Sequence, residues 1–169
     1  SAEESTPGRV RLQLVPAMPT AASPLAVEMT ELTPRVRAEV QTYLDDRRLL
    51  GSELVLENAA YTWVSAVARV RPRPRANRAR LATRAAEAIY RYVHPTTGGP
   101  DSTGWPFGRE LFAGEIYSIL QNVDGVDFVE EVFLHQVEPG TRQFGPPLTR
   151  IAPANVGLLC SYEHRVRVE

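Results

Sequence analysis

The sequence predicts an α+β fold: a mixed, mostly antiparallel sheet with helices packed on one of its faces. Segments with the alternating apolar pattern of strands interleave with segments of helical periodicity, which is typical of this class. The first five predicted elements follow the beginning of a split βαββαβ unit of the ferredoxin-like kind. The 169 residues, 43% of them hydrophobic, are enough for a buried core without disulfide bonds.

The first strand is predicted at residues 10–15, where apolar and polar residues alternate. A Pro- and Ala-rich loop follows at 16–24, and a helix is predicted to begin after Thr33, a good N-cap followed by Pro34. Gly51 offers a C-terminal stop for this helix. We expect one face of the helix to be buried, and this face carries Val36, Val40, Tyr43 and Leu44.

Two strands are predicted next, at 53–58 and at 61–71. The even positions of the longer strand are apolar and mostly small, which allows a helix to lie close to the sheet. A second helix is predicted from an Asn77 cap to about Val93, because His94 precedes a proline. Its expected buried stripe is Leu81, Ala85, Ala88, Ile89 and Tyr92.

After a loop, the sequence predicts a short strand in RELFA, a short helix in AGEIYSILQNV and a strand at 126–137. We expect Ile116, Ile119 and Leu120 of the helix to point inward. The chain then divides into a flexible tail at 1–8, one α+β module at 9–137, and an extended C-terminal segment at 138–169 whose final strand, HRVRVE, packs on the module.

The sequence contains no recognisable catalytic motif, no set of metal ligands and no cofactor-binding motif. The single thiol, Cys160, lies in an apolar context and is interpreted as a small buried hydrophobe. Cys160 and His164 lack the further ligands that a zinc site needs. Adjacent acidic pairs such as Glu130 and Glu131 point in different directions on an extended chain. We therefore expect a protein that is not an enzyme.

The loop GGPDSTGWPFGRE, residues 98–110, is the most distinctive segment. Its glycines permit backbone angles that other residues resist, and its prolines restrict the unfolded chain. A loop of this kind is built to hold one shape. We expect Asp101 to accept hydrogen bonds from the backbone of 102–104, and Arg109 to reach a carboxylate or a loop carbonyl from the following strand. Its aromatic side chains either close the end of the core or anchor a protein interface. The candidate structural and interface residues are Gly98, Gly99, Pro100, Asp101, Gly104, Trp105, Pro106, Phe107, Gly108 and Arg109.

An arginine-rich run, RVRPRPRANRAR, suggests a different function, in which its side chains bind a charged partner. These arginines are expected at a turn, where they are solvated or contact an acidic partner or phosphates. The alternative to a structural role is therefore a nucleic-acid-binding α+β domain. The formal net charge of −1 gives no global attraction to nucleic acid. The candidate contact residues are Arg69, Arg71, Arg73, Arg75, Arg78 and Arg80.

A longer stretch, YRYVHPTTGGPDSTGWPFGRELFAGEIYSILQNVDGVDFVEEV, resembles the C-terminal region of the baseplate J-like family. This family comprises baseplate assembly proteins of contractile phage tails and related injection systems. The specific part is Gly104 to Arg109, preceded by His94-Pro95 and Gly98-Gly99-Pro100 and followed by Gly125-Val126-Asp127. With weaker patterns at both ends, the resemblance covers most of residues 8–168.

The resemblance implies a non-enzymatic wedge-type subunit of a baseplate, oligomeric only within the assembly. Its expected partners are neighbouring wedge, hub or spike, and sheath proteins, with nucleic acid and membrane excluded from the leading interpretation. The expected location is the bacterial cytoplasm during assembly and then the phage or tail-like particle. The polar start SAEESTPGR predicts no signal peptide, and the lack of an initiator Met favours a fragment of a longer protein.

Overall fold

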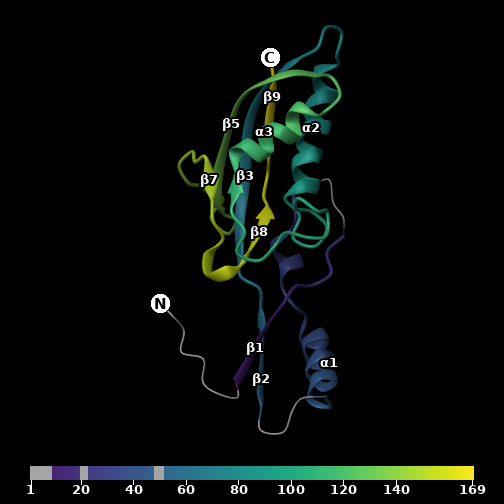
Figure 1. The fold of residues 1–169 in the computed structure, drawn as a ribbon, viewed down its shortest axis with the longest axis vertical. Helices are drawn as coiled ribbons and strands as arrows, with labels where there is room; N and C mark the ends of the chain where they lie inside the picture. Colours follow the sequence, from purple (N-terminus) through teal and green to yellow (C-terminus); the bar gives the residue numbers. More distant parts are fainter. Residues whose placement is uncertain (1–8, 20–22, 48–51) are drawn as a thin grey trace.

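The computed structural model describes residues 9–19, 23–47 and 52–169, which form two unequal parts (Figure 1). The larger part, here called the body, comprises residues 59–169 and contains a five-stranded sheet, a two-stranded pair and two α-helices. The smaller part, here called the arm, is formed by β1, β2 and α1. The arm extends from one end of the body along the long axis of the molecule.

The arm consists of two parallel strands and one helix. β1 (Arg9–Leu14) pairs with β2 (Glu53–Asn58) from Arg9↔Glu53 to Leu14↔Asn58. Between them lie the 3-10 helix η1 (Val27–Thr30) and α1 (Pro34–Asp45). The Thr33 hydroxyl caps α1 as predicted, accepting a hydrogen bond from the backbone of Val36 at 3.3 Å. Arg37 fastens α1 to β2 by donating to the carbonyl oxygen of Leu56 at 2.6 Å.

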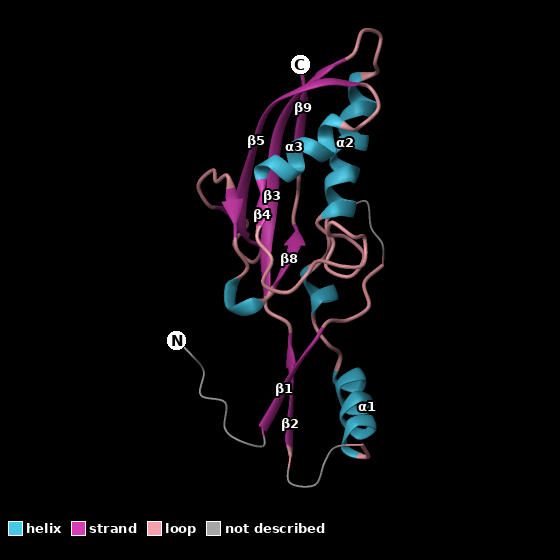
Figure 2. Ribbon diagram, viewed as in Figure 1, coloured by secondary structure: helices cyan, strands magenta, loops and turns pink. Residues whose placement is uncertain are grey.

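The body is organised around β3 (Tyr61–Pro72), the central strand of its sheet (Figure 2). β5 (Val126–Glu138) runs antiparallel along one side of β3, and β6 (Gln143–Phe144) pairs with β5. On the other side, β8 (Leu158–Ser161) and β9 (Arg165–Val168) follow each other along β3, both parallel to it.

A smaller pair of strands joins β4 (Leu111–Phe112) to β7 (Arg150–Ile151). Between β7 and β8 lies a 3-10 turn, η2 (Ala154–Val156).

Helices α2 (Arg78–Tyr92) and α3 (Ala113–Gln121) cover one face of the body's sheet. The predicted alternation of β3 explains why: its small even residues allow the helices to lie close to the sheet. Asn77 caps α2 as predicted, accepting from the backbone of Arg80 at 3.0 Å. The core between these layers includes Val64, Ala66, Val70, Leu81, Ala85, Ile89, Ile116, Leu120, Val129 and Leu134.

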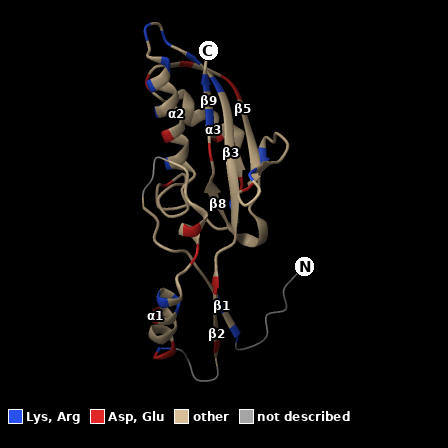
Figure 3. Ribbon diagram, turned by 180° about the vertical axis from the view of Figure 1, so that it is seen from behind, with Lys and Arg blue, Asp and Glu red and all other residues tan. Residues whose placement is uncertain are grey.

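The opposite face of the sheet is covered only at its lower end. Here Trp63, Val137 and Cys160, which are neighbours on three adjacent strands, pack with Met18 of the predicted Pro-rich loop and with Leu25, which follows it. Cys160 has no exposed surface, which confirms its interpretation as a small buried hydrophobe. In the part of the chain that the structure describes, no helix lies across the rest of this face (Figure 3).

The predicted class, an α+β fold with a mostly antiparallel sheet and helices on one face, is confirmed. The order of the split βαββαβ unit is not kept, because β1 and β2 pair with each other in the arm and neither joins the body's sheet. The expected burial of the first helix is wrong, because α1 has no buried residue. Gly51 and the predicted tail at 1–8 lie outside the described residues. Residues 158–168 supply two strands of the main sheet.

Candidate functional site

The distinctive loop begins where α2 ends, and His94 fixes this end. The imidazole is 1% exposed. Its Nδ1 accepts hydrogen bonds from the backbone of Thr96 at 3.3 Å and of Thr97 at 3.2 Å. The Nε2 therefore carries the proton and donates to the carbonyl oxygen of Pro19 at 3.1 Å. Burial lowers the pKa of His94, so the ring is neutral and holds the loop in place.

The glycines of the loop are required by its backbone. The Gly99 amide donates to the carbonyl oxygen of Tyr92 at 2.7 Å, and the Gly104 amide donates to that of Gly98 at 2.9 Å. A side chain at Gly98 would place its Cβ 2.2 Å from the Tyr92 oxygen. Gly99 has a φ of +80° and Gly104 a φ of +113°, which favour glycine. Backbone hydrogen bonds thus fold the loop back onto itself and onto the end of α2, and its glycines adopt the backbone angles that their presence predicted.

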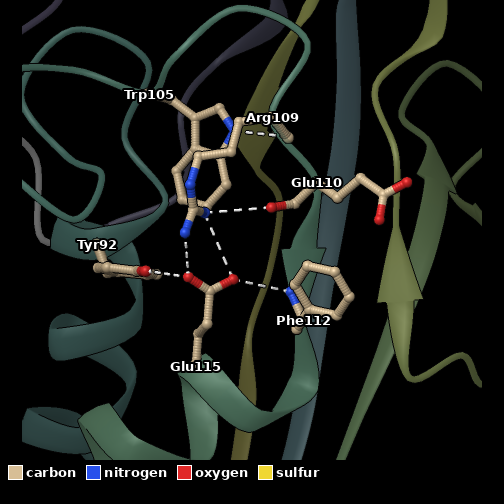
Figure 4. A network of polar contacts seen from close by, with 6 residues as sticks. All are labelled: Tyr92, Trp105, Arg109, Glu110, Phe112 and Glu115. Atoms are coloured by element: carbon tan, nitrogen blue, oxygen red, sulfur yellow. Dashed lines mark hydrogen bonds and ion pairs between the residues drawn. The ribbon is translucent and has the colours of Figure 1, made fainter.

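Trp105 points inward from this loop and is 3% exposed. Its indole Nε1 donates to the carbonyl oxygen of Arg109 at 3.0 Å. Its ring meets Tyr92 edge to face, with centroids 5.6 Å apart, and the Arg109 guanidinium lies 4.9 Å from the Trp105 ring centroid (Figure 4). Trp105 therefore closes the end of the core between α2 and β4, the first of the two predicted roles.

Glu115, on the first turn of α3, is the centre of the polar network in Figure 4. It accepts hydrogen bonds from Arg109 at 2.5 Å, from the Tyr92 hydroxyl at 2.6 Å and from the Phe112 amide at 3.0 Å. A Glu three residues after the residue that begins a helix is half of a capping box. Through this network one carboxylate joins α2, the loop, β4 and α3.

The same contacts set the ionisation of the network. Burial raises the pKa of Glu115, but hydrogen bonds from Arg109, Tyr92 and Phe112 outweigh burial and leave the pKa below its usual value. The hydrogen bond with Glu115 raises the pKa of Arg109. Burial, followed by the hydrogen bond to Glu115, raises the pKa of Tyr92 to about 12. The network is thus an ion pair between Arg109 and Glu115, joined by the neutral phenol of Tyr92.

Phe107, the other aromatic residue of the loop, points outward and is 45% exposed. Beside it, Val156 of η2 is 68% exposed and has a φ of +52°, which is strained for a β-branched residue. The amide of Gly108 donates to the carbonyl oxygen of Gly157 at 2.9 Å and joins the two turns. Phe107 and Val156 line a hollow of about 400 Å³ against the arm, together with Arg11, Gln13 and Glu57.

One expectation for the loop is wrong. Asp101 was expected to accept hydrogen bonds from the backbone of 102–104, yet among the described residues it has no hydrogen-bond partner, and it is exposed. The Ser102 amide donates instead to the carbonyl oxygen of Gly99 at 3.3 Å. Arg109 does reach a carboxylate and a carbonyl, as predicted, but it does so from the turn before β4.

The arginine run divides into two groups. Arg69 and Arg71 lie within β3, whereas Arg71 was expected at a turn. Arg69 contacts Glu131 at 2.6 Å and Glu130 at 3.2 Å, and Arg71 contacts Glu130 at 2.7 Å. The other members lie at the tip of the body, and among the described residues they have no carboxylate partner: Arg73, Arg75, Arg78 and Arg80. The tip carries a hollow of about 520 Å³ lined by Asn77, Arg80, Thr83 and Arg84.

A second buried polar cluster surrounds His164. Its Nδ1 accepts from the Ala66 amide at 2.9 Å, so its Nε2 donates to the Ser161 hydroxyl at 3.0 Å. Ser161 in turn donates to the carbonyl oxygen of Val93 at 2.8 Å. Burial lowers the pKa of His164 to about 3, which keeps the ring neutral. Ser161 is 1% exposed, so this Ser–His pair connects α2 to the β8–β9 break and is not accessible to a substrate.

Sequence reasoning missed Tyr90, Glu115 and the role of His164. The spacing from Phe112 to Glu115 was a usable signal for a helix start. Tyr90 and His164 had no such signal, because they meet only through the fold: the His164 amide donates to the Tyr90 hydroxyl at 3.0 Å.

Within the described ranges, no three His, Cys, Asp or Glu side chains lie together as metal ligands would. No helix in that part of the chain has the length and apolarity to cross a bilayer. In comparisons with known proteins, no family model and no curated protein matches the chain.

Proposed function

We propose that this chain is a non-enzymatic structural module of a contractile-tail or injection-system baseplate, and part of a longer wedge-type protein. The proposal rests on how the fold holds the Gly-Trp-Pro-Phe-Gly-Arg segment, which is the most specific part of the resemblance. Its tryptophan is buried and its arginine is held in an ion pair. This segment acts as a rigid brace, which a building block of an assembly needs.

Two surface features support a role in assembly. Phe107 and Val156 are exposed apolar side chains on turns that are hydrogen-bonded to each other, and stiff apolar anchors are typical of protein interfaces. The arm has exposed apolar residues as well, with Val36 41% exposed and Tyr43 59% exposed. The partners are proposed to be neighbouring wedge, hub or spike, and sheath proteins. The module assembles in the bacterial cytoplasm and then remains in the particle.

Coexpression tests this proposal. The full-length gene product is coexpressed with the sheath, tube, spike and wedge proteins encoded beside it, and the products are separated by size and imaged by electron microscopy. We expect the wild type to enter a complex. We expect Phe107→Ala to enter it at reduced yield with an unchanged melting temperature. If the wild type remains outside every complex, or if its neighbouring genes encode no tail proteins, the proposal is wrong.

The tip arginines favour a second candidate function, nucleic-acid binding. Arg73, Arg75, Arg78 and Arg80 project at one end of the body without carboxylate partners among the described residues. Binding of a labelled oligonucleotide is measured by fluorescence anisotropy at several salt concentrations. If this function holds, the affinity falls steeply as the salt concentration rises. Changing Arg78 and Arg80 to Gln then makes the plot of log affinity against log salt concentration less steep, by the equivalent of about two phosphate contacts. Salt-independent or absent binding excludes it.

A further inference from the structure

The helix-free face of the body's sheet combines an apolar centre with an arginine rim. Side chains from four strands share this face because they occupy matching register positions. We call it the open face, and it consists of Val67, Arg69, Arg71, Phe128, Glu131, Phe133, Phe144, Arg165 and Arg167. Figure 3 shows this side of the sheet, with basic residues along β9 and acidic residues along β5.

Phe144 forms a wall at one end of the open face. Its ring centroid lies 6.2 Å from that of His135 on β5 and 6.0 Å from that of Tyr162, which follows β8. The ring therefore spans the width of β3 at the level of Ser65, which is fully buried. The Arg165 guanidinium lies 5.0 Å from the centroid of the same ring.

Beyond this wall the open face holds a small hollow. Its volume is about 160 Å³, and its apolar lining is formed by Val67, Ala68 and Phe133. A water molecule takes roughly 30 Å³ in the liquid, so the hollow has room for one aliphatic side chain. Arg167 and Arg69 stand on its rim, opposite Glu131 and Glu169.

The arginines of the open face differ in their partners. Arg69 and Arg71 are neutralised by Glu130, Glu131 and Glu169. Arg165 and Arg167 are exposed and, among the described residues, have no carboxylate partner. Because they are two residues apart on β9, both project on the same side of the sheet. The rim thus offers two exposed arginines that have no carboxylate partner among the described residues, beside an apolar hollow.

We propose that the open face docks an extended protein segment in which apolar and acidic side chains alternate. One apolar side chain of the segment enters the hollow over Val67 and Phe133, and its carboxylates pair with Arg165 and Arg167. Alternation is required because an extended segment presents every second side chain to the sheet. The inference rests on the proposed function, since the segment would belong to a neighbouring subunit of the assembly.

A protein segment fits this face better than a nucleic acid does. Base stacking needs free aromatic faces. Arg71 lies 5.1 Å from the Phe128 ring centroid and Arg165 lies 5.0 Å from that of Phe144, so two of the three rings already have a cation over them. Exposed phenylalanine and arginine side chains that lie together are typical of protein interfaces.

The test uses the intact 169-residue chain and three labelled hexapeptides: alternating Glu-Leu, Glu-Phe and Asp-Val. Binding is followed by fluorescence anisotropy, and the site is mapped by backbone amide shifts of the wild type. We expect at least one peptide to bind with a dissociation constant below about 1 mM. The shifted amides should cluster on β3, β5 and β9. No binding by any of the three, or shifts elsewhere, would overturn the proposal.

Matched variants make the test specific. Arg165→Gln with Arg167→Gln should weaken peptide binding about tenfold, because it removes two exposed charge pairs. Arg78→Gln with Arg80→Gln removes the same charge from the tip and should change the affinity by less than about twofold. Equal losses in both variants, or equal binding of a Lys-Leu hexapeptide, would mean non-specific attraction. Tighter binding of a twelve-nucleotide oligothymidylate to the same strands would identify the open face as a nucleic-acid site instead.

Failure of this inference is distinguishable from failure of the proposed function. If the wild type enters the coexpressed complex but no peptide binds, the docking face is wrong and the structural role stands. If the wild type enters no complex, the structural role fails whatever the peptides do.

Discussion

The body and the arm carry similar amphipathic patterns but differ in how much of them is buried. On α2, Leu81, Ala85 and Ile89 have no exposed surface, whereas α1 has no buried residue. The difference lies in what each helix meets. α2 packs against the body's sheet, whereas among the described residues α1 lies beside β2, one strand of a two-stranded parallel pair. Parallel strands are normally covered on both faces, and a two-stranded pair alone is marginal in water.

This comparison shows that an amphipathic stripe predicts where a helix would be buried, not that a partner surface exists. Helical stability in proteins comes mainly from tertiary packing. We therefore expect the body to determine the global stability of the chain and the arm to unfold locally at lower cost. Matched substitutions in the two parts test this expectation.

The largest expected effect is at the boundary between the two parts. Trp105→Ala should lower the free energy of unfolding by about 3–5 kcal/mol, because it empties a buried aromatic site. Phe107→Ala, two residues away and facing the hollow beside the arm, should cost under about 1 kcal/mol, because nearly half of the residue is already exposed. Urea denaturation followed by circular dichroism measures both. Equal losses would contradict the division into a core residue and an exposed one.

A matched leucine pair compares the helices directly. Leu81→Ala on α2 should cost about 2–5 kcal/mol, since Leu81 is fully buried. Leu44→Ala on α1 should cost roughly 1 kcal/mol or less, since Leu44 is half-buried and its surroundings can relax. Hydrogen exchange should show faster exchange of α1 amides than of α2 amides in the wild type. Similar protection of the two helices would show that the arm is as stable as the body.

The third prediction separates the parts by pH. His164, in the body, has a pKa lowered by burial to about 3, against about 6.5 when unfolded. The unfolded state therefore binds more protons between these values, so stability is full above about pH 6.5 and falls as the pH decreases, by at most roughly 1.4 kcal/mol per unit. His94, whose pKa burial also lowers, acts in the same direction.

His164→Gln should flatten the decrease between pH 6.5 and pH 4.5 as measured by urea denaturation, even though the variant is less stable at neutral pH. Leu81→Ala, which lowers stability without removing a titratable group, serves as the control and should keep the wild-type slope. An unchanged slope in His164→Gln would show that this histidine is not held neutral.

The smallest contrast compares two ion pairs. Glu115→Gln should lower the free energy of unfolding by about 1–3 kcal/mol. The Glu115 carboxylate accepts hydrogen bonds from three donors, and the change leaves Arg109 without its charge partner. Glu39→Gln in the arm removes the exposed pair with Arg35 and should cost about 0.3–0.5 kcal/mol. Thermal unfolding of the two variants resolves the difference. A cost for Glu115→Gln as small as that for Glu39→Gln would mean that the network in Figure 4 contributes little.

Features that depend on neighbouring residues were predictable from the sequence. Thr33 and Asn77 cap their helices as expected, because an N-cap acts on an amide only three residues away. The small even face of β3 predicted its helix-covered side, since strand alternation is a local property. The closed form of the loop at 98–109 also followed from the positions of its glycines and prolines.

Features that depend on distant residues were not predictable. Asp101 was expected to tighten the loop, but backbone contacts with the end of α2 hold it instead. Glu115 became a centre only because folding brings Tyr92 and Arg109 to the first turn of α3.

The sequence alone determined the α+β class, most of the elements, the helix caps and the need for glycine in the aromatic loop, because each depends on short-range patterns of side chain and backbone. The tertiary structure decided that β1 and β2 lie outside the main sheet, that α1 has no buried residue, and that Arg165 and Arg167 have no carboxylate partner among the described residues. These outcomes depend on contacts between residues that are far apart in the sequence, and no local pattern contains that information.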